Sequence, residues 1–291
     1  MSNVTAQMVK ELRDRTGAGM MECKKALQDA NGDMEKAVEF MRKAGQAKAD
    51  KKSSRIAAEG VISLGIRNNN AVMLEINCET DFVAKDENFL KFVKKISDMA
   101  LDSYKDNLKD FSNCKDFSGN SVEEIRLQLV SKVGENVQIR RIYLIKNENA
   151  FLGHYIHGTR IGVVLILEKE DEELAKDICM HIAAMKPIVL NSKDISKEDL
   201  EKEKEIYIAQ ASESGKPKDI IEKMVEGKVK KYISEVTLLE QFFVKDNELT
   251  ISNLLRKHNN NILSFYRMEV GEGIDKKNEN FADEVMAQLK K

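Results

Sequence analysis

The sequence is poor in cysteine, has no excess of basic residues and contains no long apolar run. Its 291 residues include four scattered cysteines with no CxxC spacing, Cys23, Cys78, Cys114 and Cys179. So few cysteines exclude a disulfide framework, and we read them as reduced thiols. The 47 basic and 49 acidic residues leave a formal net charge of -2. Because proteins that follow a phosphate backbone normally carry a basic excess, nucleic acid is disfavoured as the main ligand and protein partners fit better.

Signals for a membrane or for secretion are absent too. No segment approaches the roughly 18 continuous apolar residues that suggest a membrane span. The N-terminal residues show no basic region followed by an apolar run. We therefore expect a cytoplasmic protein with no membrane contact, and the length allows two or three domains with sizeable cores.

Glycine-rich loops that bind nucleotides are also missing. Gly215-Lys216 is no phosphate-binding loop, because position 210 is Gln and a proline follows at 217. The pair Gly271 and Gly273 lacks the third glycine of a dinucleotide-binding loop.

Histidine and cysteine pairs make poor metal or catalytic sites. His154 and His157 lie three positions apart on an expected strand and point to opposite faces. Cys179 and His181 lie two apart on an expected helix and do not face each other. The sequence therefore predicts no cofactor, no metal site and no catalytic residues. For His157 the plain interpretation is a surface or sheet-edge histidine.

Residues 1–45 have the pattern of three short helices in a compact bundle. Thr5 and Asp33 are suited to begin the first and third helices as N-caps. The adjacent Met20 and Met21 cannot both point inward, and methionine is common at binding surfaces, so contact and plain packing both stay open. Residues 46–54 contain no apolar residue larger than alanine and form either a linker or a solvated helix extension.

The middle of the chain repeats one pattern, in which two strands joined by a turn are followed by an acidic helix start. It occurs at 61–100 and again at 151–186, which favours two related α+β subdomains. Helices are expected from Asp86 and from Ser121, which forms a capping box with Glu124. Expected strands lie at 59–66, 71–78, 137–145, 150–156, 160–167, 240–245 and 262–270. The stretch 101–120 is expected to be irregular, and 251–258 to be a short helix.

Residues 196–234 predict a two-helix hairpin with heavily charged outer faces, turning at Gly215 and Pro217. A charge run is usually a solvated face, but the apolar stripe also allows self-association with another chain. A last helix would carry Phe281, Val285 and Leu289 on its apolar face.

Thr80, Asp81, Phe82 and Val83 form what we call the elbow, between the strand Val72 to Asn77 and the helix that Asp86 begins. An Asp-Phe pair at such a place cannot send both side chains into the core, because a buried unpaired carboxylate is very costly. Two interpretations remain open. Either Asp81 is a local cap and Phe82 a core residue, or one or both face a partner.

Several segments together resemble translation elongation factor Ts. They are Leu12–Leu27, the elbow, Lys132–Asn136, His157–Gly162, Ser214–Pro217 and Val270–Gly273. These motifs occur in the family's order and cover essentially the whole chain. The departures are small: Glu79 stands where glutamine is frequent, and Met185 stands where a small polar residue is usual.

The resemblance implies an α+β fold with five parts. They are a UBA-like three-helix bundle at 1–45, a linker at 46–54, a core subdomain with the elbow at 55–145, a second core subdomain at 146–270 with a coiled-coil hairpin inserted at 196–234, and a C-terminal helical module at 271–291.

The resemblance also implies a guanine-nucleotide exchange factor that binds elongation factor Tu in its GDP-bound and nucleotide-free states. In the family, the residues at Asp81 and Phe82 disturb the partner's Mg²⁺ and phosphate site, while Thr80 and Val83 would set the elbow. Arg13, Met20, Met21 and the last helix would contact the partner's nucleotide domain. His157 would contact its far domain.

Two other classes of function fit parts of the sequence. An adaptor or chaperone would use the bundle and the hairpin as docking arms and would leave nucleotide release unchanged. A metal- or thiol-dependent enzyme would turn over a small substrate or bind a metal. Release of labelled GDP from elongation factor Tu, with and without this chain, separates the three.

Overall fold

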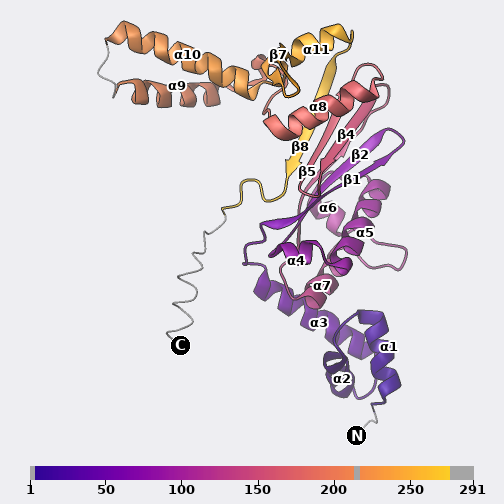
Figure 1. Ribbon diagram of the computed structural model, residues 1–291. Coiled ribbons are helices and arrows are strands. Elements are labelled where there is room, and N and C mark those ends of the chain that lie inside the picture. The colour runs from indigo at the N-terminus through magenta and orange to yellow at the C-terminus, as the bar shows by residue number, and fades with distance from the viewer. Residues whose placement is uncertain (1–3, 213–216, 276–291) are drawn as a thin grey trace. The chain divides into compact units, whose positions relative to one another are not determined.

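The computed structural model describes residues 4–212 and 217–275, which fall into two compact units (Figure 1). The first unit comprises Met1–Gly65, Val72–Leu144 and Glu269–Lys291, and the second comprises Ile66–Ala71 and Ile145–Met268. The fold is mixed α+β, with N-terminal helices followed by small sheets. Among the described residues, no helix is long and apolar enough to cross a membrane.

Three helices begin the first unit, α1 (Ala6–Thr16), α2 (Met20–Asp29) and α3 (Met34–Lys52). The predicted caps are confirmed, because Thr5 accepts from the Met8 amide and Asp33 from the Lys36 amide. Helix α3 runs through most of 46–54, so the helix-extension interpretation is correct and the linker interpretation is wrong. Its Ala49 is buried against the core of the sheet that follows.

The first sheet has the order β1-β2-β3, with β1 at Glu59–Arg67, β2 at Asn70–Cys78 and β3 at Gln138–Ile145. Asn68 and Asn69 adopt positive φ at the tight turn between β1 and β2, where a hairpin was predicted. Helices α5 (Glu87–Ser103) and α7 (Val122–Val133) share one hydrophobic core with this sheet (Figure 1).

Helix α7 has the predicted ends. Ser121 and Glu124 form a capping box, and Gly134 ends the helix at φ 80. The prediction that 101–120 is irregular is wrong in part, because α5 continues to Ser103 and a short helix, α6, spans Leu108–Ser112. Asn107 caps α6.

A buried carboxylate joins this sheet to the segment that follows the last strand. Glu75 on β2 is 0% exposed and pairs with Arg140 and Arg141 of β3. The backbone N–H of Gly271 donates to the same carboxylate at 2.8 Å. Arg140 also donates to the carbonyl of Glu272 at 2.6 Å. The first unit is therefore completed by residues that come late in the chain.

The second unit is built on a sheet of order β4-β5-β8, with β4 at Phe151–His157, β5 at Ile161–Leu167 and β8 at Ile262–Glu269. Strands β4 and β5 are antiparallel, from Phe151 opposite Leu167 to His157 opposite Ile161. Helix α8 (Glu172–Met185) packs on this sheet at short range: a Cβ added at Gly153 would lie 2.5 Å from the Cβ of Ala175.

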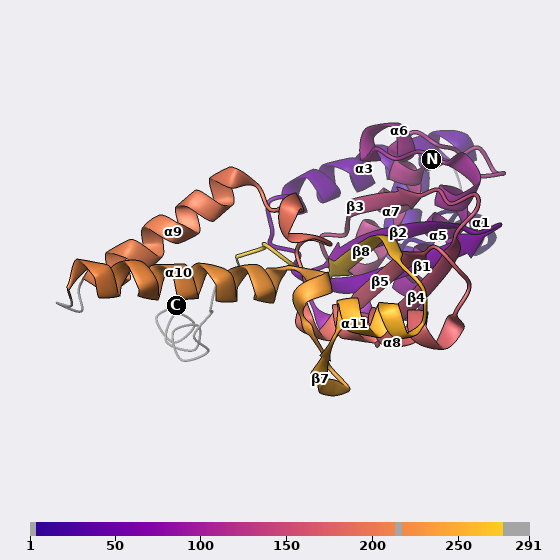
Figure 2. The ribbon, with the colours of Figure 1, turned by 90° about the horizontal axis from the view of Figure 1, so that it is seen from above.

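Helices α9 (Lys197–Ser212) and α10 (Lys218–Val236) lie side by side and reach away from this sheet (Figures 1 and 2). The segments that enter and leave the hairpin are joined at its base, because the amides of Ile188 and Val189 donate to the carbonyl of Val236. Pro217 is the N-cap of α10 rather than its first helical residue, and Gly215 lies outside the described residues.

The end of the second unit differs from the predicted strand at 240–245. The described part of this unit contains the 3₁₀ turns η1 (Ser192–Asp194) and η2 (Leu238–Glu240). After η2 come β6 (Phe242–Phe243), β7 (Asp246–Thr250) and the expected short helix α11 (Ile251–Lys257). The predicted last helix, with Phe281, Val285 and Leu289, lies outside the described residues.

Candidate functional site

The elbow follows closely after β2, which ends at the buried Cys78. Thr80 then caps a one-turn helix, α4 (Asp81–Ala84), by accepting from the Val83 amide at 3.3 Å. Val83 and Ala84 pack against the core of the first unit, and Asp86 caps α5. The elbow is therefore a short capped helix whose second half is anchored in the core.

Phe82 points outward from this helix and is 82% exposed. The interpretation of Phe82 as a core residue is therefore wrong. Asp81 is exposed as well and pairs with Lys85 at 2.8 Å, whereas the cap is Thr80. The ammonium of Lys85, which donates to Asp81, holds the pKa of that carboxyl below its usual value. The elbow thus presents an aromatic ring and an ionised carboxylate next to each other.

Glu135 fastens the start of the elbow to the loop that follows α7. One carboxylate oxygen of Glu135 accepts from the amides of Glu79 at 3.1 Å and Thr80 at 3.0 Å. The other oxygen accepts from the Thr80 hydroxyl at 2.7 Å. In return, the Glu79 carboxylate accepts from the Asn136 amide at 2.6 Å. The carboxylates of Glu79 and Glu135 therefore join the start of the elbow to the loop after α7 by reciprocal hydrogen bonds.

The thiol nearest the elbow is not reactive. Cys78 is fully buried and its thiol lies 3.1 Å from the carbonyl of Thr80, as a donor. Burial, together with the nearby charge of Glu135, raises the pKa of Cys78 to about 12. Burial also raises the pKa of Cys179. Since a thiolate is the nucleophile and the metal ligand, neither residue suits a thiol-dependent enzyme at neutral pH.

The candidate contact residues of the bundle lie around the loop between α1 and α2. Arg13 is exposed in the last turn of α1, and its carbonyl accepts from the Gly17 amide. Met20 and Met21 occupy the first turn of α2 and are 47% and 76% exposed. Both methionines face solvent, so plain packing does not account for them.

His157 lies at the end of β4 in the second unit, while the other candidate residues lie in the first. It is exposed, and its Nδ1 is 2.9 Å from the hydroxyl of Tyr155. Within the described ranges, no three His, Cys, Asp or Glu side chains gather where they could hold a metal ion.

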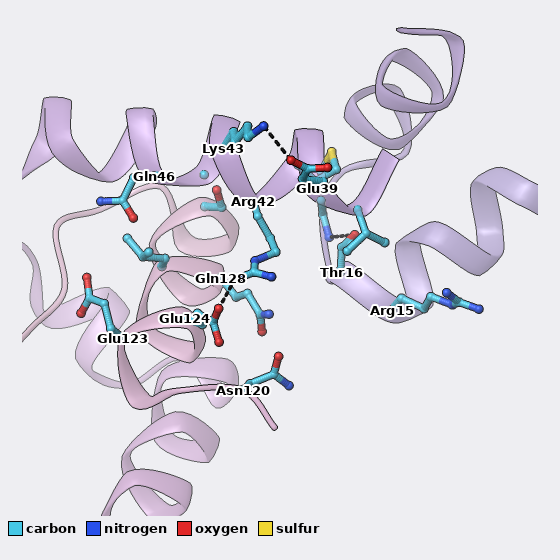
Figure 3. Close-up of a pocket in the computed structure, with 16 residues that line it drawn as sticks. Arg15, Thr16, Glu39, Arg42, Lys43, Gln46, Asn120, Glu123, Glu124 and Gln128 are labelled. Carbon is cyan, nitrogen blue, oxygen red and sulfur yellow. Dashed lines mark hydrogen bonds and ion pairs between the residues drawn. The ribbon is translucent and has the colours of Figure 1, made fainter. Parts of the chain in front are cut away.

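A hollow of about 780 Å³ between α3 and α7 is separate from the elbow (Figure 3). Its charged lining residues already have partners: Arg42 pairs with Glu124, and Lys43 pairs with Glu39. Arg15 at its edge pairs with two glutamates. Because these charges are satisfied within the chain, the hollow does not have the character of a site for a charged ligand.

Comparison with known proteins gives one family. The family model described as "Elongation factor TS" matches residues 79–272. The elongation factor Ts of Thioalkalivibrio sulfidiphilus is 56% identical over 290 residues, which cover 99% of each chain. That of Legionella pneumophila (strain Lens) is 52% identical over 292 residues, covering 100% of each chain. That of Francisella tularensis subsp. novicida is 52% identical over 290 residues, again covering 100% of each.

Proposed function

Because the chain belongs to the elongation factor Ts family, we propose that Asp81 and Phe82 are the groups with which it loosens the nucleotide site of its partner. The family defines the activity: the chain is a guanine-nucleotide exchange factor for elongation factor Tu in translation elongation, and not an enzyme. The observation that carries the proposal is the outward Phe82, 82% exposed beside an exposed carboxylate.

The exposed ring of Phe82 on the anchored helix α4 is suited to a contact that displaces groups of a partner. Burying a phenylalanine side chain stabilises a complex by about 1.5–3 kcal/mol. Thr80 and the partly buried Val83 and Ala84 already hold the backbone, so little ordering entropy is lost on binding. The binding energy of Phe82 is then available to displace groups of the partner.

The partner's Mg²⁺ site is a sensitive target for such displacement. Mg²⁺ requires near-ideal octahedral coordination, and it bridges the phosphates of a bound nucleotide in this class of GTPase. Small shifts of the surrounding helices therefore weaken the hold on the metal and on GDP. The negative charge of Asp81, brought to the same region, disfavours the neighbouring phosphates by like-charge repulsion.

Exchange by this route requires the chain to bind nucleotide-free elongation factor Tu more tightly than the GDP-loaded form, and this coupling acts in both directions. If the chain weakens GDP binding to elongation factor Tu, GDP must weaken binding of the chain by the same factor. An acceleration of GDP release of about a thousandfold, without slower rebinding, corresponds to roughly 4 kcal/mol of coupling. Titration calorimetry against free and GDP-loaded elongation factor Tu measures this coupling directly.

Further contacts follow from the family resemblance. We propose that Arg13, Met20, Met21 and the last helix meet the nucleotide domain of elongation factor Tu, and that His157 meets its far domain. The exposure of both methionines supports the first contact. The same proposal includes the UBA-like character of the bundle, the two core subdomains with the inserted hairpin, the C-terminal module and a cytoplasmic location. It leaves out the linker at 46–54, because α3 continues to Lys52.

Self-association through the hairpin is a separate part of the proposal. Ile206 and Ile208 of α9 and Ile220 of α10 are between 42% and 48% exposed, which leaves apolar surface for a second hairpin. Sedimentation velocity over a range of concentrations tests it. A single monomeric species at all concentrations would contradict it.

The test of the main proposal is release of fluorescent GDP from purified elongation factor Tu. The expected result is fast release with the chain present and slow release without it. Equal rates, together with equal affinity for free and GDP-loaded elongation factor Tu, would favour the adaptor class instead.

A further inference from the structure

We propose that Glu135 is a positioning residue for nucleotide exchange, whose carboxylate holds the elbow in the orientation that presents Phe82. The inference rests on the function proposed above for Phe82. It differs from that proposal because Glu135 is not itself exposed on the elbow and acts only through Glu79 and Thr80.

The bonds made by Glu135 fix both the position and the direction of the helix α4. The amides of Glu79 and Thr80 are the last donors before α4, and Glu135 accepts from both. The Thr80 hydroxyl has one proton, which it donates to Glu135, and its lone pairs then face the Val83 amide. Glu135 therefore orients the group that caps the helix on which Phe82 lies.

Glu135 is itself held by rigid neighbours on both sides. Before it, Gly134 adopts φ 80 and ends α7, so the chain turns sharply toward the elbow. After it, Asn136 is buried and its side chain donates to the carbonyl of Arg55 at 2.9 Å. The next strand, β3, begins two residues later. The carboxylate is thus a fixed support.

The elbow needs such a support because α4 has only four residues. A single helical turn is unstable alone, since nucleation fixes several backbone angles for one hydrogen bond. Packing of Val83 and Ala84 restrains its second half. Without Glu135, the first half would be free to change direction, and Phe82 would sample positions that the partner cannot use.

A structural role alone would predict a different pattern of effects. If Glu135 only stabilised the fold, its loss would lower the stability of the first unit and leave the exchange rate of folded protein unchanged. If it positions Phe82, its loss lowers the GDP release rate at saturating factor. Affinity for nucleotide-free elongation factor Tu would change less, because the other contact surfaces remain.

The experiment compares Glu135→Ala, Glu135→Gln and the control Ser121→Ala in the full chain. Ser121→Ala removes the cap of α7 in the same unit without touching the elbow. Glu135→Ala removes all three hydrogen bonds to the elbow, and we expect it to slow saturated GDP release about tenfold, or about 1.4 kcal/mol. Glu135→Gln keeps one acceptor oxygen and should recover most of the rate. Ser121→Ala should keep the full rate.

Amide hydrogen exchange measures the hydrogen bonds to Glu135 independently of nucleotide exchange. The amides of Glu79 and Thr80 should be protected in the wild-type chain and in Phe82→Ala, and should exchange faster in Glu135→Ala. Protection that survives Glu135→Ala would overturn the inference, as would an unchanged GDP release rate once protection is lost.

A double variant completes the test. Glu135→Ala added to Phe82→Ala should lower the GDP release rate less than twofold further, because the group being positioned is already gone. A tenfold further loss would show that Glu135 acts independently of Phe82 and would overturn the inference. If Phe82→Ala alone left the GDP release rate unchanged, the proposed role of the elbow would fail. The amide data would still show whether Glu135 holds the backbone at Glu79 and Thr80.

Discussion

Asp81 begins α4 and Lys85 directly follows its end, with Oδ2 and Nζ 2.8 Å apart, and the exposed ring of Phe82 directly follows Asp81 in the chain. Both charged side chains are more than half exposed, at 53% and 77%. Exposed ion pairs of this kind add little to stability. The pair with Lys85 therefore lowers the pKa of Asp81 but costs little to break when a partner binds.

Replacing the ring tests the elbow most directly. Phe82→Ala should slow saturated GDP release by roughly ten- to a hundredfold, which corresponds to the about 1.5–3 kcal/mol for burial of one phenylalanine. The free energy of unfolding should change by less than about 0.5 kcal/mol, because the ring is exposed. Stopped-flow GDP release and thermal unfolding measure the two effects.

Phe117 provides a matched control for that change. It is as exposed as a phenylalanine can be, in the same unit, on the loop between α6 and α7. Phe117→Ala should leave the GDP release rate unchanged. Equal slowing by both variants would mean that the effect comes from a general loss of apolar surface and not from the elbow.

Removing the charge of Asp81 should have an effect of its own. Asp81→Asn keeps the shape of the side chain, and we expect GDP release to slow while the circular dichroism spectrum stays the same. Because the pKa of Asp81 lies below its usual value, its carboxylate stays ionised at neutral pH. The pH dependence of exchange near neutrality should therefore be the same in both proteins, and a difference would contradict the assigned charge state.

The hairpin should be dispensable for most of the exchange activity, since α9 and α10 pack on each other. A suitable variant replaces residues 200–233 by a short Gly-Ser linker and keeps the bonds from Ile188 and Val189 to Val236. Its GDP release rate should stay within about threefold of the wild-type rate, or about 0.7 kcal/mol. Abolished exchange in a folded variant would assign the hairpin a direct role.

Acid should weaken the second unit through one buried histidine. His181 is fully buried, its Nδ1 accepts from the Val244 amide and its Nε2–H donates to Gln241. Burial lowers the pKa of His181 below its usual 6.5. As pH falls below about 6.5, the unfolded chain takes up a proton that the folded chain does not, so stability falls until the folded pKa is passed.

Thermal unfolding between pH 5 and 7.5 checks the histidine prediction. His181→Asn should be less stable than the wild type at pH 7.5 and should lose less stability on acidification. His154→Gln, which changes an exposed histidine, should keep the wild-type slope. The same slope in all three proteins would assign the acid sensitivity to other groups.

Features set within a few residues could be predicted from the sequence. The caps at Thr5, Asp33, Asp86 and Ser121 each accept from an amide two or three positions ahead. Both partners of each bond therefore lie within the short sequence pattern that predicts the cap. The short helix α6 was missed because it has only five residues and buries one large side chain, Phe111, which is too little for a periodic pattern.

The candidate site was predictable in its position and not in its geometry. The Asp-Phe pair indicated that one side chain must stay outside, but that Phe82 is the exposed ring, on the outer side of α4, is known only from the structure. Glu135 meets Thr80 across 55 positions of sequence. No local pattern reveals that contact, although an acid directly after the helix-ending Gly134 is well placed to reach a neighbouring loop.

The hydrogen bond from Gly271 to Glu75 sets the order in which the two units can be completed during synthesis. The two residues are 196 positions apart. At about 5–20 residues per second on the ribosome, the Gly271 amide is made roughly 10 to 40 s after the strand that it completes. Arg140 and Arg141 are made earlier in that interval, and nearly all of the second unit is produced and can fold before Gly271 follows. The unit that leaves the ribosome first is therefore finished last.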